Sequence, residues 1–358
     1  MQYPVPLASN FPMKIGLVLS ENGPMGLWSP TVQGGAIAAA AEINEMGGVL
    51  GSEVELVNEN AGRSPEQAFA ATRKLIFEQN VDAIVGFQAS YMRPAVRKAA
   101  CGLAPYIYTP QYEGGFTGPG TAAIGITDME VLGPGISWLA DNKAAQRFFF
   151  LGNDYIWPRI AHGTTLETVA NSGGRLVGEA LLPLGFRDYD RVLDHIRKTK
   201  PDVVICALLG EDAVCFNRVF AECGLARKTI RLTLAFDETL LYGVGPENAE
   251  NLFAVQTFFS AAPARHRERM LESYKCYAGA DKPPMTVNAM NVYDSVHLAA
   301  ALARKVNRVD GFLMANVLNR NFSRPSIYDL LAQPEVAPKP KVHIAEADGT
   351  VFEIRETC

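Results

Sequence analysis

The sequence predicts an α/β protein with two lobes of parallel sheet flanked by helices and joined by a three-strand hinge. Three observations lead to this prediction. The 358 residues exceed what one hydrophobic core usually supports. Apolar, strand-like runs alternate with helical patterns of about 10–15 residues, which is typical of βαβ units. The alternation lapses and then restarts near residue 131, which indicates a second lobe.

The elements of the first lobe follow one another from Met13. Strands are expected over 13–20, 53–58, 81–87 and 104–108, and helices over 31–46, 64–79 and 92–101. Gly47-Gly48 is a signal for the end of the first helix. Ser64 supplies an N-cap for the second helix, with Pro65 at its first position and Gln67 as the capping-box residue.

The second half repeats the alternation and then changes. Helices are expected over 131–145, 157–171, 188–199, 211–223 and 237–243, and strands over 147–152, 175–182, 202–209, 230–236 and 252–258. Two long helices follow Pro263, at about 264–278 and 286–306. The tail returns to β structure over 341–347 and 351–356, around the hairpin signal Asp348-Gly349.

Three lapses in the pattern, near 120–130, 248–254 and 325–340, are the expected crossings between lobes. Residues 1–124 and 254–330 are accordingly assigned to lobe 1, and residues 125–253 and 331–358 to lobe 2. Several crossings make a hinge rather than a flexible tether, and a hinged cleft can close on a ligand.

Composition excludes several classes of protein. A net charge of −5, with no basic run beyond pairs such as Arg227-Lys228, argues against a nucleic-acid partner. No stretch approaches about 18 consecutive apolar residues, so no membrane insertion is expected. The five His residues stand far apart and form no metal-binding motif, and we expect no cofactor.

The amino terminus and the cysteines bear on location. MQYPVPLASNFP has no Lys or Arg before Lys14 and no apolar core of signal-peptide length. The six cysteines show no CxxC and no regular disulfide spacing, so buried free thiols are the simplest interpretation. We therefore expect a cytoplasmic location; a periplasmic one is the alternative if a signal peptide was removed.

Two segments predict a binding site. In FFFLGNDYIWPR, an apolar strand breaks at Gly152-Asn153-Asp154 and is followed by Tyr155 and Trp157. In YTPQYEG, Tyr108 ends another strand. Open α/β sheets bind ligands at the carboxyl ends of their strands. Both segments supply aromatic faces and neutral hydrogen-bond groups, without a nucleophile and its base, so the site should hold a small molecule without reacting with it.

These features together resemble the type I periplasmic-binding-protein superfamily, whose two lobes are Rossmann-like. The likeness is to its branched-chain amino-acid and amide-binding branch, and especially to amide sensors and to amide or urea receptors of ABC transporters. It covers nearly the whole chain. The most specific segments are VDAIVGFQASYMRPAV, YTPQYEGG and GNDYIWPR.

The resemblance implies a set of ligand contacts. Ser90 takes the place of a hydroxyl that holds the ligand's polar head, and Tyr108 that of an aromatic packed under the ligand. Tyr155 and Trp157 would close over it from the second lobe, and Asp237 would accept from a ligand nitrogen. The remaining expected contacts are Gln88, Thr109, Pro110, Gln111 and Leu209.

Several points depart from the family pattern or have a simpler explanation. Gln88 and Leu209 stand where relatives carry aromatics, and YTPQYEG differs by one residue in spacing, which leaves open whether Thr109 or Pro110 is the contact. Ser90 and Asp237 also suit plain helix caps, and Trp157-Pro158 suits a simple entry into a helix. The cleft lip is expected from Met25, Trp28 and Pro30.

The resulting hypothesis is non-catalytic binding of a small amide-like or amino-acid-like ligand, with hinge closure, by a transporter receptor or a ligand sensor. The partner would be an ABC permease or a regulatory protein; the ligand would be a short amide, urea or a branched-chain amino acid. A branched-chain amino-acid receptor is the alternative. A hydrolase would need a titratable pair in the cleft, for which only Glu113 and Glu238 are available. A repressor core is not expected, because about a dozen residues before the first strand cannot hold a helix-turn-helix.

Overall fold

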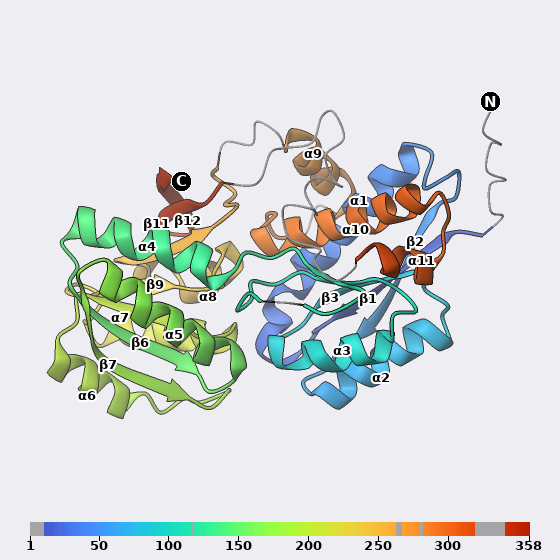
Figure 1. Cartoon of the computed structure of the whole chain (residues 1–358). Helices are drawn as coiled ribbons and strands as arrows, with labels where there is room; N and C mark the ends of the chain where they lie inside the picture. Colours follow the sequence, from blue (N-terminus) through green and yellow to red (C-terminus); the bar gives the residue numbers. More distant parts are fainter. Residues whose placement is uncertain (1–10, 116, 263–266, 280–281, 319–340) are drawn as a thin grey trace.

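Two separate sheets form the framework of the molecule (Figure 1). The computed structural model describes residues 11–115, 117–262, 267–279, 282–318 and 341–358. The first sheet has five strands in the order β2-β1-β3-β4-β5, and the second has seven in the order β12-β11-β10-β9-β8-β6-β7. Each sheet forms the centre of one lobe, which confirms the predicted α/β fold class.

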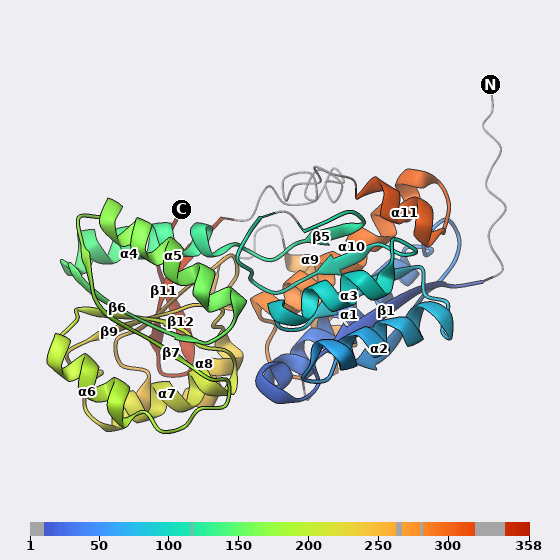
Figure 2. The ribbon, with the colours of Figure 1, turned by 60° about the horizontal axis from the view of Figure 1, so that its bottom comes forward.

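Lobe 1 is a parallel sheet covered by helices on both faces. Its strands are β1 (Met13–Leu19), β2 (Val54–Asn60), β3 (Ala83–Phe87), β4 (Tyr106–Tyr108) and β5 (Thr121–Ala123). The short helices η1 (Gly23–Trp28) and η2 (Ser90–Met92) follow β1 and β3. The α-helices are α1 (Ser29–Glu45), α2 (Pro65–Phe77), α3 (Arg93–Ala100), α9 (Glu268–Tyr277), α10 (Val287–Val306) and α11 (Gly311–Val317). In both ribbon views α2 and α3 lie on the face opposite α1 and α10 (Figures 1 and 2).

Lobe 2 has the same layers, with a hairpin at one edge of its sheet. Its parallel strands are β6 (Arg147–Asn153), β7 (Arg175–Leu182), β8 (Val203–Ala207), β9 (Ile230–Thr233) and β10 (Leu252–Gln256). The antiparallel hairpin of β11 (His343–Asp348) and β12 (Val351–Thr357) pairs with β10. The helices are α4 (Asp128–Lys143), α5 (Ile156–Asn171), α6 (Asp190–Thr199), α7 (Glu211–Glu222), α8 (Glu238–Val244) and the short η3 (Pro246–Asn248). Helices α4 and α5 cover one face, and α6, α7 and α8 the other (Figure 2).

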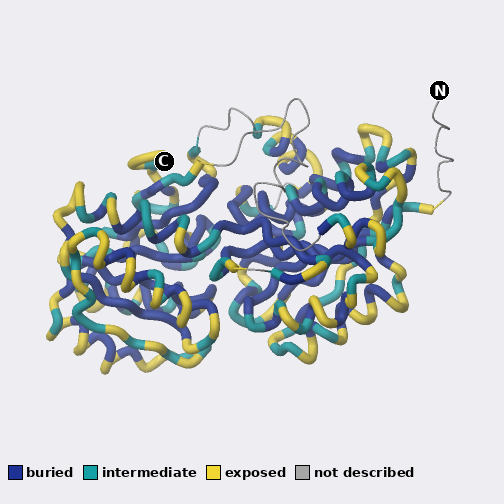
Figure 3. Tube along the Cα trace, in the orientation of Figure 1, coloured by how far each residue is buried: buried dark blue, intermediate teal, exposed yellow. Residues whose placement is uncertain are grey.

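The apolar runs form these strands because both faces of each parallel sheet are covered. Along β6, Phe148 and Phe150 face the α4–α5 side, whereas Phe149 and Leu151 face the α7 side, and all four are fully buried. This is the alternation of a strand with two buried faces. The tube coloured by burial shows the central strands of both sheets buried under more exposed helices (Figure 3), whereas the edge strands β2, β7 and β12 are only partly buried.

The observed elements follow the predicted order, with some additions. The strand β5 (Thr121–Ala123), the helix α11 (Gly311–Val317) and the short helices η1 and η3 were not predicted from the sequence. Strands expected to reach residues 209 and 236 end earlier, at Ala207 and Thr233. Their last expected residues lie in loops, in which Gly210 and Ala235 take positive φ angles of 50° and 47°.

The crossings between lobes need a correction. The first lies between β5 and α4, as expected near 120–130. The second does not lie at 248–254: it follows β10, because Leu252–Gln256 pairs with β9 and β11 in the second sheet. The expected boundary between 253 and 254 therefore falls inside a strand. The third crossing, near 325–340, and the boundary at 330 lie outside the described residues.

Two further expectations concern surface properties. All six cysteines are free, but only Cys206 is buried; Cys215 is half-buried and the other four are exposed, so the interpretation as buried thiols was wrong for most of them. Cys223, for example, caps the carboxyl end of α7. Within the described residues, no helix has the length and apolar character needed to span a membrane.

Candidate ligand site between the lobes

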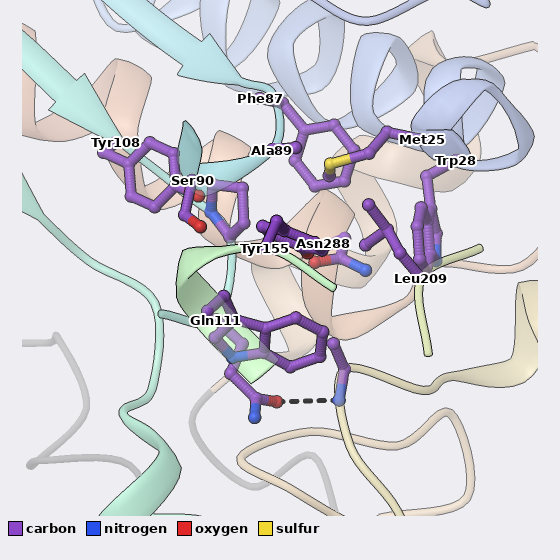
Figure 4. A pocket seen from close by; sticks show the side chains of 13 residues that line it. Met25, Trp28, Phe87, Ala89, Ser90, Tyr108, Gln111, Tyr155, Leu209 and Asn288 are labelled. Carbon is purple, nitrogen blue, oxygen red and sulfur yellow. Dashed lines mark hydrogen bonds between the residues drawn. The ribbon is translucent and has the colours of Figure 1, made fainter. Parts of the chain in front are cut away.

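A cavity lies where the two lobes meet. The close-up shows side chains from both lobes converging on it (Figure 4). Its 13 lining residues are Met25, Trp28, Phe87, Ala89, Ser90, Tyr108, Pro110, Gln111, Tyr155, Trp157, Leu209, Ala235 and Asn288.

Strand topology explains why these residues meet. In lobe 1 they follow the carboxyl ends of β1, β3 and β4; in lobe 2 they follow β6, β8 and β9. Asn288 is added from the first turn of α10. Since parallel strands end at the same edge of a sheet, the two sheets direct their carboxyl ends at one cavity.

Five of the 13 lining residues are aromatic. From lobe 1, Trp28 packs edge-on against Phe87 at a centroid distance of 6.0 Å, and Tyr108 is fully buried beside them. From lobe 2, Tyr155 lies 6.1 Å from Trp157. Such rings bury a large apolar area and suit a ligand with a flat or aliphatic body.

The lobes touch each other at the cavity. The ring of Tyr155 packs edge-on against Tyr91 of η2, with centroids 5.5 Å apart. Gln111 Oε1 accepts from the backbone N–H of Ala235 at 3.0 Å, the bond drawn in Figure 4. Gly210 lies so near Pro24 that a Cβ on it would fall 1.6 Å from the Pro24 carbonyl oxygen. The structure is therefore a closed form.

Asp237 does not line this cavity, so the expectation that it faces a ligand is corrected. It is fully buried, and its Oδ1 accepts from Trp28 Nε1 at 2.8 Å and from Thr239 N at 3.0 Å. Its Oδ2 accepts from Asn288 Nδ2 at 2.9 Å. Burial raises the pKa of Asp237. The carboxylate thus caps α8 and holds two lining side chains of the opposite lobe.

A second buried carboxylate, Asp128 at the start of α4, holds two other lining side chains, Trp157 of its own lobe and Gln111 of the opposite lobe. Its Oδ1 accepts from Trp157 Nε1 at 2.8 Å and from Gln111 Nε2 at 2.9 Å. Burial raises its pKa to about 7. Sequence reasoning missed Asp128, because nothing in the local pattern distinguishes it from an ordinary acidic residue in a first helical turn.

Seven of the ten expected contacts line the cavity: Ser90, Tyr108, Pro110, Gln111, Tyr155, Trp157 and Leu209. Ser90 Oγ is buried and has no partner within the described structure. Leu209 is fixed through its backbone N–H, which donates to Asn153 Oδ1 at 2.8 Å. This set supplies the buried hydroxyl of Ser90 among apolar and aromatic surfaces.

Besides Asp237, two expected contacts point elsewhere. Gln88 is fully buried behind the strand and donates to the hydroxyl of Tyr106. Thr109 Oγ1 donates to Gly86 O at 3.0 Å. Both side chains make these hydrogen bonds within lobe 1. They do not line the cavity, because successive side chains of an extended segment point to opposite faces.

The lining residues not among the expected contacts fall into two groups. Met25 and Trp28 were expected only as a lip of the cleft and instead line the cavity, whereas Pro30 does not. Phe87, Ala89, Ala235 and Asn288 carried no expectation. Phe87, the last residue of β3, could have been found from the strand-end rule, whereas Asn288 lies on a helix remote in sequence.

No charged side chain is among the 13 lining residues. The two carboxylates considered for a hydrolase are engaged: Glu113 pairs with Arg93 at 2.6 Å, and Glu238 accepts from Ser260 N at 2.6 Å. In the described ranges, no cluster of three or more His, Cys, Asp or Glu is placed to hold a metal. The cavity therefore offers hydrogen bonds and apolar contact, and its lining includes no base beside Ser90.

The sequence matches a family model described as periplasmic binding protein over residues 12–355. A curated relative, a Leu/Ile/Val-binding protein of Rhizobium johnstonii, is 26% identical over 250 residues. That alignment covers 66% of this chain and 62% of the relative, so the match spans less than two thirds of the relative's length. The family match contradicts the predicted cytoplasmic location, which was wrong: the family is one of periplasmic proteins.

Solved structures share the fold over almost the whole chain. The branched-chain amino-acid transporter substrate-binding protein of Streptococcus pneumoniae, in complex with isoleucine, has a TM-score of 0.80 at 17% identity, covering 97% of this chain and 98% of that one. An ABC-transporter solute-binding protein of Rhodopseudomonas palustris, in complex with 3,4-dihydroxybenzoic acid, has a TM-score of 0.79 at 19% identity, covering 96% of each chain.

Proposed function

The chain belongs to the periplasmic binding protein family, and on this premise we propose that it is the solute receptor of an ABC transporter. It binds a small organic molecule in the interlobe cavity, closes on it, and releases it unchanged to a permease. The observation that carries the proposal is the cavity itself, formed by residues of both lobes and lined by apolar, aromatic and neutral polar side chains. A pocket of this kind suits reversible binding at micromolar affinity, about −8 kcal/mol.

A short carboxamide is the ligand class that the lining supports best. Ser90 Oγ is a buried hydroxyl without a partner in the described structure, and it can donate to a ligand carbonyl oxygen. Tyr108 and Tyr155 supply surfaces for the ligand's body. An amide needs no ion pair, and no charged side chain lines the cavity to make one.

A branched-chain amino acid is the second candidate. The curated relative is named a Leu/Ile/Val-binding protein, and a structural neighbour holds isoleucine. A benzoate would also suit the aromatic walls, and other neighbours hold such acids. These candidates differ in the charge of the head group, which a direct comparison separates.

The test is a binding panel on the purified protein. Thermal shift identifies ligands among butyramide, urea, leucine, valine and benzoate, because a bound ligand raises apparent stability by mass action. Calorimetry then gives the affinity and stoichiometry, with one site expected per chain. If no member of the panel binds with a dissociation constant below about 1 mM, the proposed function is wrong for these solutes.

A further inference from the structure

The cavity carries the same arrangement on both of its sides. Asp237 holds the indole N–H of Trp28 and the side-chain amide of Asn288. Asp128 holds the indole N–H of Trp157 and the side-chain amide of Gln111. Each set thus contains a buried carboxylate, a tryptophan and a primary amide, and the tryptophan and the amide line the cavity while the carboxylate does not.

The direction of these bonds decides what the cavity can offer. Four of its lining side chains give an N–H group to an aspartate outside the lining. Gln111 Oε1 is also occupied, since it accepts from Ala235 N at 3.0 Å. What these side chains present to a ligand is mainly indole surface, with the carboxylates behind it.

A ligand ammonium would find no counter-ion among the described lining residues. Neither carboxylate lines the cavity: Asp237 accepts from Trp28 and Asn288 with its two oxygens, whereas Asp128 accepts from Trp157 and Gln111 with Oδ1 and its Oδ2 has no partner in the described structure. Glu113 is paired with Arg93 at 2.6 Å. Burying a cation costs several kcal/mol when no carboxylate meets it. A carboxamide with the same hydrocarbon body avoids that cost.

We propose that Asp128 and Asp237 are positioning residues that orient Trp157 and Trp28, and that holding both carboxylates outside the lining in this way makes the cavity select carboxamides over α-amino acids. The inference rests on the proposed function, because it names the ligand class of the same cavity. It assigns to Asp237 a role opposite to that of a ligand-binding acid: it acts through Trp28 and Asn288, whose contacts with it cross from one lobe to the other.

Isovaleramide and leucine provide the test, since they share an isobutyl group and differ in the ammonium and carboxylate. The unmodified protein should bind isovaleramide at least tenfold more tightly than leucine. Trp28→Phe keeps an aromatic ring but removes the N–H that occupies Asp237, so the ratio of the two affinities should fall at least threefold. Trp138→Phe is the matched control, because Trp138 packs against Phe253 outside the cavity and should leave the ratio unchanged.

Asp237→Asn provides a second variant in case Trp28→Phe does not fold. It should weaken both ligands by a similar factor, because it loosens a wall that both contact. The inference would be overturned if the unmodified protein bound leucine more tightly than isovaleramide and Asp237→Asn weakened only the binding of leucine. The proposed receptor function would not be affected by that result. An unchanged ratio in Trp28→Phe would also overturn it. Failure of the whole panel to bind would instead refute the proposed function.

Discussion

Gly210 offers a sharp test of lobe closure, because it stands in lobe 2 against the backbone of lobe 1. Its φ and ψ of 50° and −115° suit glycine. A Cβ added there would fall 1.6 Å from Pro24 O, whereas real Cβ contacts essentially never come below 3.0 Å. In Gly210→Ala, Pro24 must therefore retreat by roughly 1.4 Å, and each lobe can stay folded only if the lobes part locally.

The displacement of Pro24 determines how much ligand affinity should be lost. Pro24 and Trp28 belong to the same short helix, η1, so the shift stretches the 2.8 Å bond from Trp28 Nε1 to Asp237 beyond hydrogen-bond range. A hydrogen bond to a charged group contributes about 1.5–3 kcal/mol. If the closed form is destabilised by that free energy, ligand affinity falls about 10- to 150-fold, at about 1.4 kcal/mol per factor of ten.

Calorimetry with the tightest ligand of the panel measures the affinity, and chemical denaturation measures the free energy of unfolding. Gly224→Ala is the matched control: its φ of 77° is also positive, but nothing lies within 4 Å of the added Cβ. Gly224→Ala should lose a backbone term of about 1–2 kcal/mol in stability, and Gly210→Ala should lose more, because its ψ of −115° lies outside the left-handed helical region. Only Gly210→Ala should lose affinity. Equal ligand affinities in the two variants would refute the argument from closure.

Three further predictions concern the site, the buried acids and the thiols. Tyr155→Ala and Ser90→Ala should each weaken binding by about 1–3 kcal/mol in calorimetry, through a lost aromatic contact and a lost hydrogen bond, without unfolding the protein; unchanged affinity in both would place the ligand elsewhere. Because burial raises the pKa of Asp128 to about 7, the folded protein holds this proton more tightly than the unfolded chain, and the stability it contributes is lost as pH rises from about 4 to 7. In Asp128→Asn, the free energy of unfolding should decrease less steeply with pH over that range. The same dependence on pH in the variant and the unmodified protein would contradict this. In a thiol titration, the four exposed cysteines should react in the native state and Cys206 only after denaturation; early reaction of Cys206 would show that β8 opens readily.

The sequence predicted the cavity's position well, because strand order alone determines which loops meet. Tyr108, Tyr155 and Ser90 each follow an apolar run that could be identified as a strand, and the carboxyl ends of those strands face the cleft. Asn288 could not be predicted this way, since its place depends on how α10 packs against α1.

The direction of a side chain was harder to predict than its position. Asp237 follows a strand and caps a helix, as its sequence context indicates, but its carboxylate meets Trp28, a residue 209 positions earlier. The second crossing was misplaced for a similar reason. The run that forms β10 adjoins a lapse in the pattern, and only its pairing with β9 and β11 shows that it belongs to lobe 2.

The packing of α1 against α10 has a consequence for the order in which the chain can fold. Gly35 of α1 lies so close to α10 that a Cβ on it would fall 2.3 Å from Ala289 O, across more than 250 residues of sequence. During synthesis, the side of α1 that contacts α10 therefore stays exposed to solvent until residues 287–306 have left the ribosome. The five parallel strands of lobe 2 are complete by Gln256, so that lobe can assemble its centre first. Contacts of such long range slow folding and leave apolar surface open to other chains meanwhile.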